Sequence, residues 1–245
     1  MNVPNYSRAD MIRDARFLRA MAIVLLALTI AGFAPRYLMP LVQGAYDPPA
    51  QWNAWMHPHA IAGFGFSLLF IVQPTLIARG YFGAHRAMGL VGAGLVALSV
   101  ASGVGVQLGM YPTSPDDLSN IMGGAFRLLQ SLPVMAGFFL AAWMMRRRPD
   151  WHWRFMYQVG FAAIGTILGR IYLHYTPMPE ELIGPMVGLG NLLFVALLPV
   201  SDKVRHGRVH PASWIGLAVF IAFQAVVVPL SASDWWLGMT TGGLT

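Results

Sequence analysis

The chain has 245 residues, of which 56% are hydrophobic and only 11% are charged, whereas a soluble domain is about 25% charged. This composition indicates a membrane protein without a separate soluble domain, because each helix that crosses a bilayer uses about 20 apolar residues. Cysteine is absent, which excludes disulfides, thiolate metal sites and cysteine nucleophiles.

Apolar runs predict an all-α polytopic membrane bundle with seven transmembrane helices in one domain, residues 17–237. A polar segment, 1–16, precedes this domain and a short tail, 238–245, follows it. In the N-terminal segment, Ser7 and Asp10 have the spacing of a helix capping box. The expected spans, in chain order, are 17–39, 55–78, 87–110, 121–145, 151–175, 182–200 and 212–230.

Three of these elements carry features that predict local structure. The third span is rich in glycine, which lets neighbouring helices approach closely, so we expect it to be a central helix. The fourth span carries Arg127 and Gln130, and Pro133 is expected to bend it. The tail contains Trp235 and Trp236, which are typical of an aromatic belt at a membrane interface.

Basic residues predict the orientation of the chain. All but three of the 16 lysines and arginines fall in segments that share a side with the N-terminus; the exceptions are Arg36, Arg127 and Arg170. Cytoplasmic loops carry the excess of positive charge, so this distribution predicts an N-in, C-out protein of a bacterial inner membrane. The net charge of +6 is then a consequence of topology, and we expect the lipid bilayer as a partner but no nucleic acid.

The fifth span carries charge inside an apolar helix. Arg170 and His174 are one helical turn apart and share a face with Thr166. The helical stretch from Trp153 to Arg170 is about 25 Å long, which places Arg170 in the outer leaflet. Ionisable groups inside a span are costly, so each is a functional-site hypothesis.

The same reasoning on depth predicts an outer-leaflet site of histidines, arginines and one glutamine. Guanidinium groups favour carboxylate or phosphate, and imidazoles ligate metals. Haem b uses both kinds of group, and we expect it as the cofactor, with His59 and His174 as axial metal ligands. Arg127 and Arg170 would hold the propionates. The expected site residues are His57, His59, Arg127, Gln130, Arg170 and His174.

A second haem is expected at the inner side, where His85 and His152 head the third and fifth spans. Two haems would give an electron path across the membrane, an arrangement like that of a b561-type cytochrome, although no sequence motif of that family is present.

Structural interpretations of the same residues stay open. The His57-Pro58-His59 entry is also typical of an interfacial cap, with the two histidines on different helix faces. Arg127 could snorkel or pair with Asp116 or Asp117, and Arg170 could pair with a glutamate of the following loop. His85, His152, His206 and His210 could be solvated loop residues.

Two other functions fit the sequence. The chain could be an accessory or binding subunit that packs against a membrane-protein partner or a second copy, with its arginines on a lipid or quinone headgroup. It could also transport a small organic anion. A retinal Schiff base is excluded because the only lysine, Lys203, lies in a loop, and the lack of an acid at mid-membrane depth disfavours a proton pump.

Several polar landmarks between residues 56 and 202 resemble an uncharacterised family of bacterial multi-pass membrane proteins, which is known only as a domain of unknown function. The resemblance implies a helical membrane bundle with a shared His/Arg site and no established reaction. The landmarks are His59, Gln73-Pro74, His85-Arg86, His152 with Met156, Arg170 and Asn191-Leu192.

Overall fold

A computed structural model of the chain describes residues 6–46, 54–111, 114 and 116–242. All regular structure in this part of the chain is helical, which confirms the all-α prediction. The elements are α1 (Arg8–Phe33), the π-helical η1 (Ala34–Leu38), α2 (Met39–Val42), α3 (Met56–Ala78), α4 (Phe82–Leu108), α5 (Leu118–Ala125), the π-helical η2 (Phe126–Ser131), α6 (Leu132–Met144), α7 (Pro149–Phe161), α8 (Ile164–Tyr175), α9 (Glu180–His206), α10 (Pro211–Ser231) and α11 (Asp234–Thr241).

Within the described residues, six helical stretches are long and apolar enough to cross a membrane. They are Arg8–Val42, Met56–Ala78, Phe82–Leu108, Asn120–Met144, Glu180–His206 and Pro211–Ser231. Each matches one of the predicted spans, because long apolar runs determine where such helices form. The irregularity expected at Pro133 takes the form of η2, a π-helical turn, with the proline in the first turn of α6.

The remaining expected span, 151–175, is not one continuous helix. α7 ends at Phe161, and α8 begins at Ile164 after two alanines. Alanine is the best helix former, so local propensity does not cause this break. Tertiary packing surrounds it instead, since the Phe161 ring stacks between Tyr157, at 4.6 Å, and Phe194, at 5.4 Å. The prediction of an uninterrupted helix was therefore wrong.

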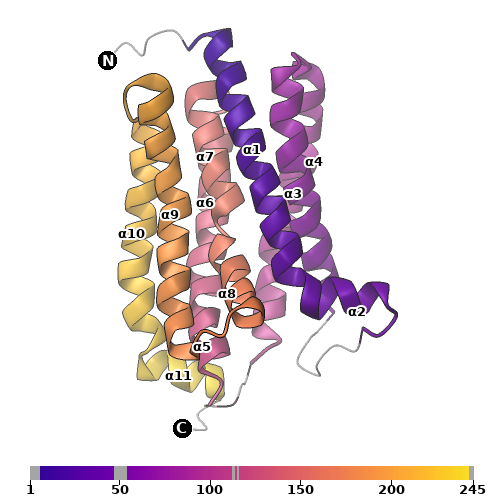
Figure 1. Cartoon of the computed structure of the whole chain (residues 1–245), viewed down its shortest axis with the longest axis vertical. Helices are drawn as coiled ribbons and strands as arrows, with labels where there is room; N and C mark the ends of the chain where they lie inside the picture. Colours follow the sequence, from indigo (N-terminus) through magenta and orange to yellow (C-terminus); the bar gives the residue numbers. More distant parts are fainter. Residues whose placement is uncertain (1–5, 47–53, 112–113, 115, 243–245) are drawn as a thin grey trace.

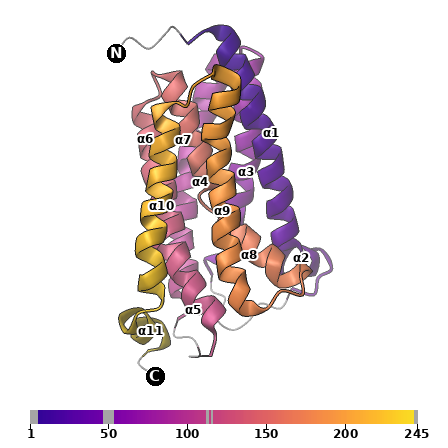
Figure 2. The ribbon, with the colours of Figure 1, turned by 60° about the vertical axis from the view of Figure 1, so that its left-hand side comes forward.

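The helices run side by side along one long bundle (Figures 1 and 2). One end, which we call the basic end, holds the start of α1 and the turns α3–α4, α6–α7 and α9–α10, where most arginines lie. The opposite, far end holds α2, α5 and α11. α7 and α8 follow one another down the bundle between α1 and α9. They cover much of its length together, although each piece is short.

The centre of the bundle is α7. Its buried residues come from almost every face of the helix and include Trp153, Phe155, Tyr157, Val159 and Phe161. By contrast, α4 exposes large apolar side chains along one face, such as Leu90, Val91 and Leu108. The prediction that the glycine-rich third span is the central helix was therefore wrong. Some of its glycines allow close contacts, as where Gly92 meets Leu69 of α3 and Gly103 meets Leu132 of α6, whereas a Cβ at Gly89 or Gly94 would meet nothing within 4 Å.

The two ends of the chain also refine the predictions. Ser7 and Asp10 form the expected capping box, but the helix that they start is α1 itself, so the first span begins inside segment 1–16. At the other end, α11 packs against α5, and Trp236 is fully buried with its Nε1 donating to the carbonyl of Ile121 at 2.7 Å. An interface role fits only Trp235, which is 60% exposed. Part of the tail, 243–245, lies outside the described residues.

Glycine at position 160 of α7 makes room for the Phe70 ring, which reaches across from α3. A Cβ there would collide with the Phe70 ring, whereas a Cβ at Gly137 of α6 meets nothing within 4 Å. We expect Gly160→Ala to destabilise the protein by about 1–3 kcal/mol through overpacking. Gly137→Ala should stabilise it by about 0.5–1 kcal/mol, because alanine favours the helix. Thermal unfolding in detergent compares the two, and equal melting temperatures would contradict this account of the interface.

Candidate functional site

Two histidines from different helices face each other near the basic end. His85 lies in the first turn of α4 and His152 in the first turn of α7. Their ring centres are 6.3 Å apart and their planes are nearly perpendicular, at 87°. We call these two residues the histidine pair. The structure thus takes them out of the solvated loops to which one interpretation assigned them.

The hydrogen bonds of the pair leave ring nitrogens available. His152 Nδ1 lies 2.8 Å from the carbonyl of Ala142, so Nδ1 carries the proton and donates it, and Nε2 has a lone pair. His85 Nδ1 is buried without a hydrogen-bond partner. The backbone of Gln73 lies close to His85, and the Gln73 side-chain oxygen is also buried and unpartnered. Three helices, α3, α4 and α7, therefore bring unsatisfied ligating atoms to one region.

The spacing of the pair suits a shared metal centre. A metal–imidazole bond is about 2.0–2.1 Å long, so two imidazoles on one ion have ring centres about 6 Å apart. A carbonyl that fixes Nδ1 is the usual support for a metal-binding histidine. Within the described part of the chain there is no cluster of three or more His, Asp or Glu side chains that could hold an ion. A metal here would therefore need ligands besides these side chains, such as a porphyrin.

A second polar region lies at the far end. Arg170 of α8 places its guanidinium 4.5 Å from the Phe33 ring centre, and the charges of Arg127 and Arg36 act on it. We call these three arginines the arginine cluster. In the described residues, no salt bridge joins a carboxylate to any of the three, since all the ion pairs found there involve Arg13, Arg154, Arg205, His206 or His210.

Arg127 is bonded to neutral groups. Its Nε donates to Gln107 Oε1 at 2.5 Å and its Nη2 to Asn120 Oδ1 at 3.0 Å. The charge of Asp117 acts on it as well, as the structural interpretation expected. Side chains of the protein therefore already bond to the Arg127 guanidinium. Arg170 is the better candidate to bind an anionic ligand.

The outer histidines divide as their spacing predicted. His57 is exposed and its Nδ1 contacts the Tyr37 hydroxyl at 3.0 Å. His59 turns inward, with Nδ1 at 3.2 Å from both the carbonyl of Ser99 and the hydroxyl of Ser102. His174 is half-buried, and the charge of Arg170 reaches both His59 and His174. Their pairing on one metal stays a prediction.

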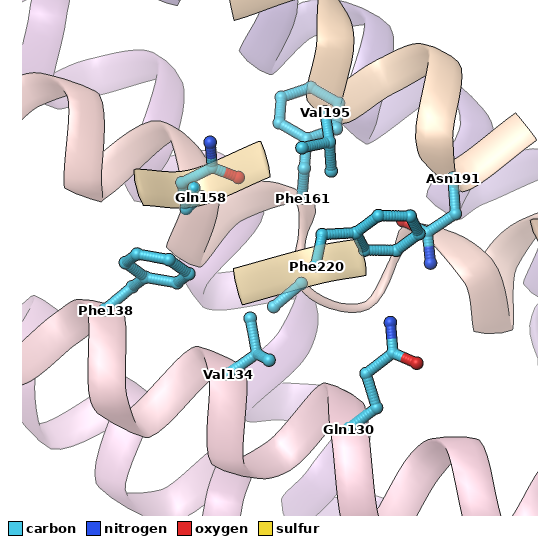
Figure 3. A pocket seen from close by; sticks show the side chains of 10 residues that line it. Gln130, Val134, Phe138, Gln158, Phe161, Asn191, Val195 and Phe220 are labelled. Atoms are coloured by element: carbon cyan, nitrogen blue, oxygen red, sulfur yellow. The ribbon is translucent and has the colours of Figure 1, made fainter. Parts of the chain in front are cut away.

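Gln130, the last predicted site residue, is not part of the arginine cluster. It lines a small pocket between α6, α7, α9 and α10, together with two more carboxamides, Gln158 and Asn191 (Figure 3). We call this the carboxamide pocket. It lies beside the break between α7 and α8, because Phe161 and Ala162 also line it.

Sequence reasoning missed an ion-pair network at the basic end. Arg154 of α7 binds Asp202 of α9 through Nη2 at 2.6 Å and Nε at 3.0 Å, and both side chains are almost fully buried. Ser213 of α10 donates to the same carboxylate at 2.5 Å. One buried carboxylate therefore joins three helices. The signal was present, because an acid at a span end on the basic side needs a partner.

The network continues to α1 and to the α9–α10 turn. Asp14 of α1 accepts from Arg205 and Tyr6, and lies 2.9 Å from His206 Nε2. His210 accepts the Ala212 amide through Nδ1, so its proton is on Nε2, 3.2 Å from Asp150. Burial first, and then the charge of Arg154, lower the pKa of His210 below its usual range. These histidines hold the fold together rather than ligate a cofactor.

Comparison with protein families, with curated proteins and with solved structures found no match to this chain. The resemblance to an uncharacterised family therefore stays a hypothesis, and the argument on function rests on the geometry above.

Removing the charge of Asp202 tests the missed network. Asp202→Asn leaves Arg154 buried without its counter-ion, so we expect a loss of about 3–5 kcal/mol in the free energy of unfolding. The matched control is Glu181→Gln at an exposed position of α9, which should change stability by less than about 0.5 kcal/mol. Both are measured by denaturant or thermal unfolding of purified protein. Equal stability of the two variants would show that the buried pair is not a principal tie between α7 and α9.

Proposed function

We propose that the chain crosses a bacterial inner membrane seven times, with the basic end in the cytoplasm and the C-terminus outside. The support is the concentration of arginines at one end and the joint length of α7 and α8, which have 13 and 12 residues. Together they exceed the roughly 20 residues that a span needs, although neither does alone. The interrupted helix is then the fifth of the seven spans in chain order, and the histidine pair lies near the cytoplasmic surface.

We further propose that the protein binds haem b and carries electrons within the membrane. The observation that supports this best is the histidine pair: two imidazoles, from α4 and α7, whose ring centres are 6.3 Å apart and which would hold the iron. This moves the first choice of ligands from His59 and His174 to His85 and His152. Haem, when bound, supplies one-electron chemistry.

The residues around the pair fit this group. His152 is oriented by its bond to the Ala142 carbonyl, and the buried Nδ1 of His85 has no hydrogen-bond partner among the described residues. The charge of Arg86 acts on His85, and a guanidinium in that place would bind a propionate. Near the pair, Phe155 of α7 packs against Phe138 of α6, with ring centres 5.7 Å apart.

A spectrum of the purified protein tests the proposal. We expect protein from haem-replete cells to show a Soret band, and His85→Ala and His152→Ala to lose most of it, because each removes an axial ligand. The control is His57→Ala, at an exposed histidine, which should keep the full band. A His59→Ala or His174→Ala variant that loses the band while His152→Ala keeps it would restore the outer pair as the ligands. Colourless wild-type protein would refute haem binding.

A second function, binding of an anionic headgroup by an accessory subunit, is favoured by Arg170. This guanidinium lies over Phe33, has neighbours of its own charge sign, and has no carboxylate partner among the residues described. A lipid phosphate or an acidic ligand would compensate it. Transport of a small organic anion would use the same arginine.

Lipid exchange measures the second function. In native mass spectra of protein from anionic-lipid nanodiscs, we expect Arg170→Gln to retain several-fold less phosphatidylglycerol than wild type, because one guanidinium–phosphate contact is lost. Arg208→Gln makes the same charge change at an exposed position of the basic end and serves as the control. Equal lipid retention by both variants would argue against a headgroup site at Arg170.

A further inference from the structure

The interruption between α7 and α8 leaves backbone groups without helical partners deep in the bundle. Ala163, the residue before α8, has no side-chain cap, and the last turn of α7 closes with a long bond of 3.4 Å from Ala162 to Val159. Helix ends leave N–H and C=O groups unsatisfied. Within a membrane interior such groups need partners from side chains or from bound water.

Polar side chains gather at this place. Gln130, Gln158 and Asn191 are 4%, 3% and 7% exposed, and they come from η2, α7 and α9. Figure 3 shows Gln130 and Asn191 reaching toward one another across the pocket, with Gln158 further along its wall. Gln130 lies in a π-helical turn, and such turns often occur at functional sites. Two irregular backbone segments therefore meet at one polar site.

Two of these carboxamides lack partners. Gln130 Oε1 needs a donor and Gln158 Nε2 needs an acceptor, and both atoms are buried without either. An unsatisfied buried polar group costs about 1–3 kcal/mol, so two of them at one pocket call for an explanation. The Gln158 side chain also presses against Gly216 of α10, where a Cβ would collide with it. The glycine thus makes room for a carboxamide rather than for an apolar side chain.

The size and chemistry of the pocket define its ligand. The cavity is about 10 Å³, close to the smallest volume that holds one water molecule. None of its lining side chains is charged: the others are Val134, Phe138, Phe161, Ala162, Val195, Gly216 and Phe220. The ligand must therefore be small and neutral, and must both donate and accept hydrogen bonds.

We propose that the carboxamide pocket is an internal water-binding site at the joint of α7 and α8. Bound water here supplies a donor to Gln130 Oε1 and an acceptor to Gln158 Nε2, the two buried atoms that lack partners. This site does not depend on haem at the histidine pair or on an anion at Arg170.

Water-edited solid-state NMR of the full chain in lipid bilayers tests this directly. With ¹⁵N-labelled glutamine, magnetisation from water should reach the side-chain NH₂ groups of Gln130 and Gln158 at least several-fold faster than that of Gln107. Gln107 is an internal reference, because it is equally buried, at 2% exposure, and its Nε2 already donates to the Tyr111 hydroxyl at 3.0 Å.

The NH₂ signals of Gln158 and Gln130 are assigned by the one signal that disappears in Gln158→Met and in Gln130→Met, respectively. If either variant fails to fold, correlations from the backbone amide of that residue in the wild type assign its side chain. Transfer to Gln130 and Gln158 that is as slow as to Gln107 would overturn the proposal. Fast transfer to both in the wild type, with loss of the Gln130 transfer when Val134→Phe fills the pocket, would establish it.

Discussion

Inside a bilayer, solvent cannot bond to a polar group, so each such group in this bundle must be matched by another part of the chain or by a ligand. Some of the buried polar groups have such partners and others do not. Arg154 and Asp202 match each other completely, and Arg127 is matched by two neutral side chains. His85, Gln130 and Gln158 each bury an atom that has no hydrogen-bond partner among the described residues. The unmatched atoms are where we propose that a cofactor or water binds.

The interrupted helix α7–α8 organises these positions along the bundle. α7 begins with His152, continues to Arg154 and Gln158, and ends beside the carboxamide pocket, while α8 carries Arg170 toward the far end. A single apolar helix could not present so many polar groups at a tolerable cost. The ion pair of Arg154 with α9 and the packing of Phe161 against Phe194 hold α7 up to the break, and α8 beyond it packs against α1 and α9. The candidate sites at the two ends therefore share one structural support.

The sequence allowed prediction of what local composition controls. Long apolar runs located six helices, although the first begins nine residues before its predicted start, at the capping box of Ser7 and Asp10. The break after Phe161 could not be predicted, because its alanines favour helix and only contacts with α9 and α10 distinguish the position. For the same reason, the glycines of α4 suggested a central helix although only one face of α4 is covered.

The sequence predicted which residue types form the candidate sites better than it predicted which of them lie together in space. Spacing placed His57 and His59 on different faces, but which of them turned inward depended on Ser99 and Ser102 of another helix. His85 and His152 were expected at one level, yet their mutual approach came only with the packing of α4 and α7. Gln130 was assigned to the arginines by depth, whereas its helix face directs it to Asn191. The depth of a residue in the membrane can be read from the sequence. The direction in which its side chain faces around the bundle axis depends on tertiary contacts.

The whole placement of these sites depends on α7 and α8 crossing the membrane together. The chain has no cysteine, so single cysteines can report the side of each loop through a membrane-impermeant maleimide. Arg147→Cys before α7 and Pro177→Cys after α8 are both at exposed positions. This account predicts that intact cells label Pro177→Cys only, and that Arg147→Cys reacts after the inner membrane is opened. Labelling of both positions from the same side would contradict it.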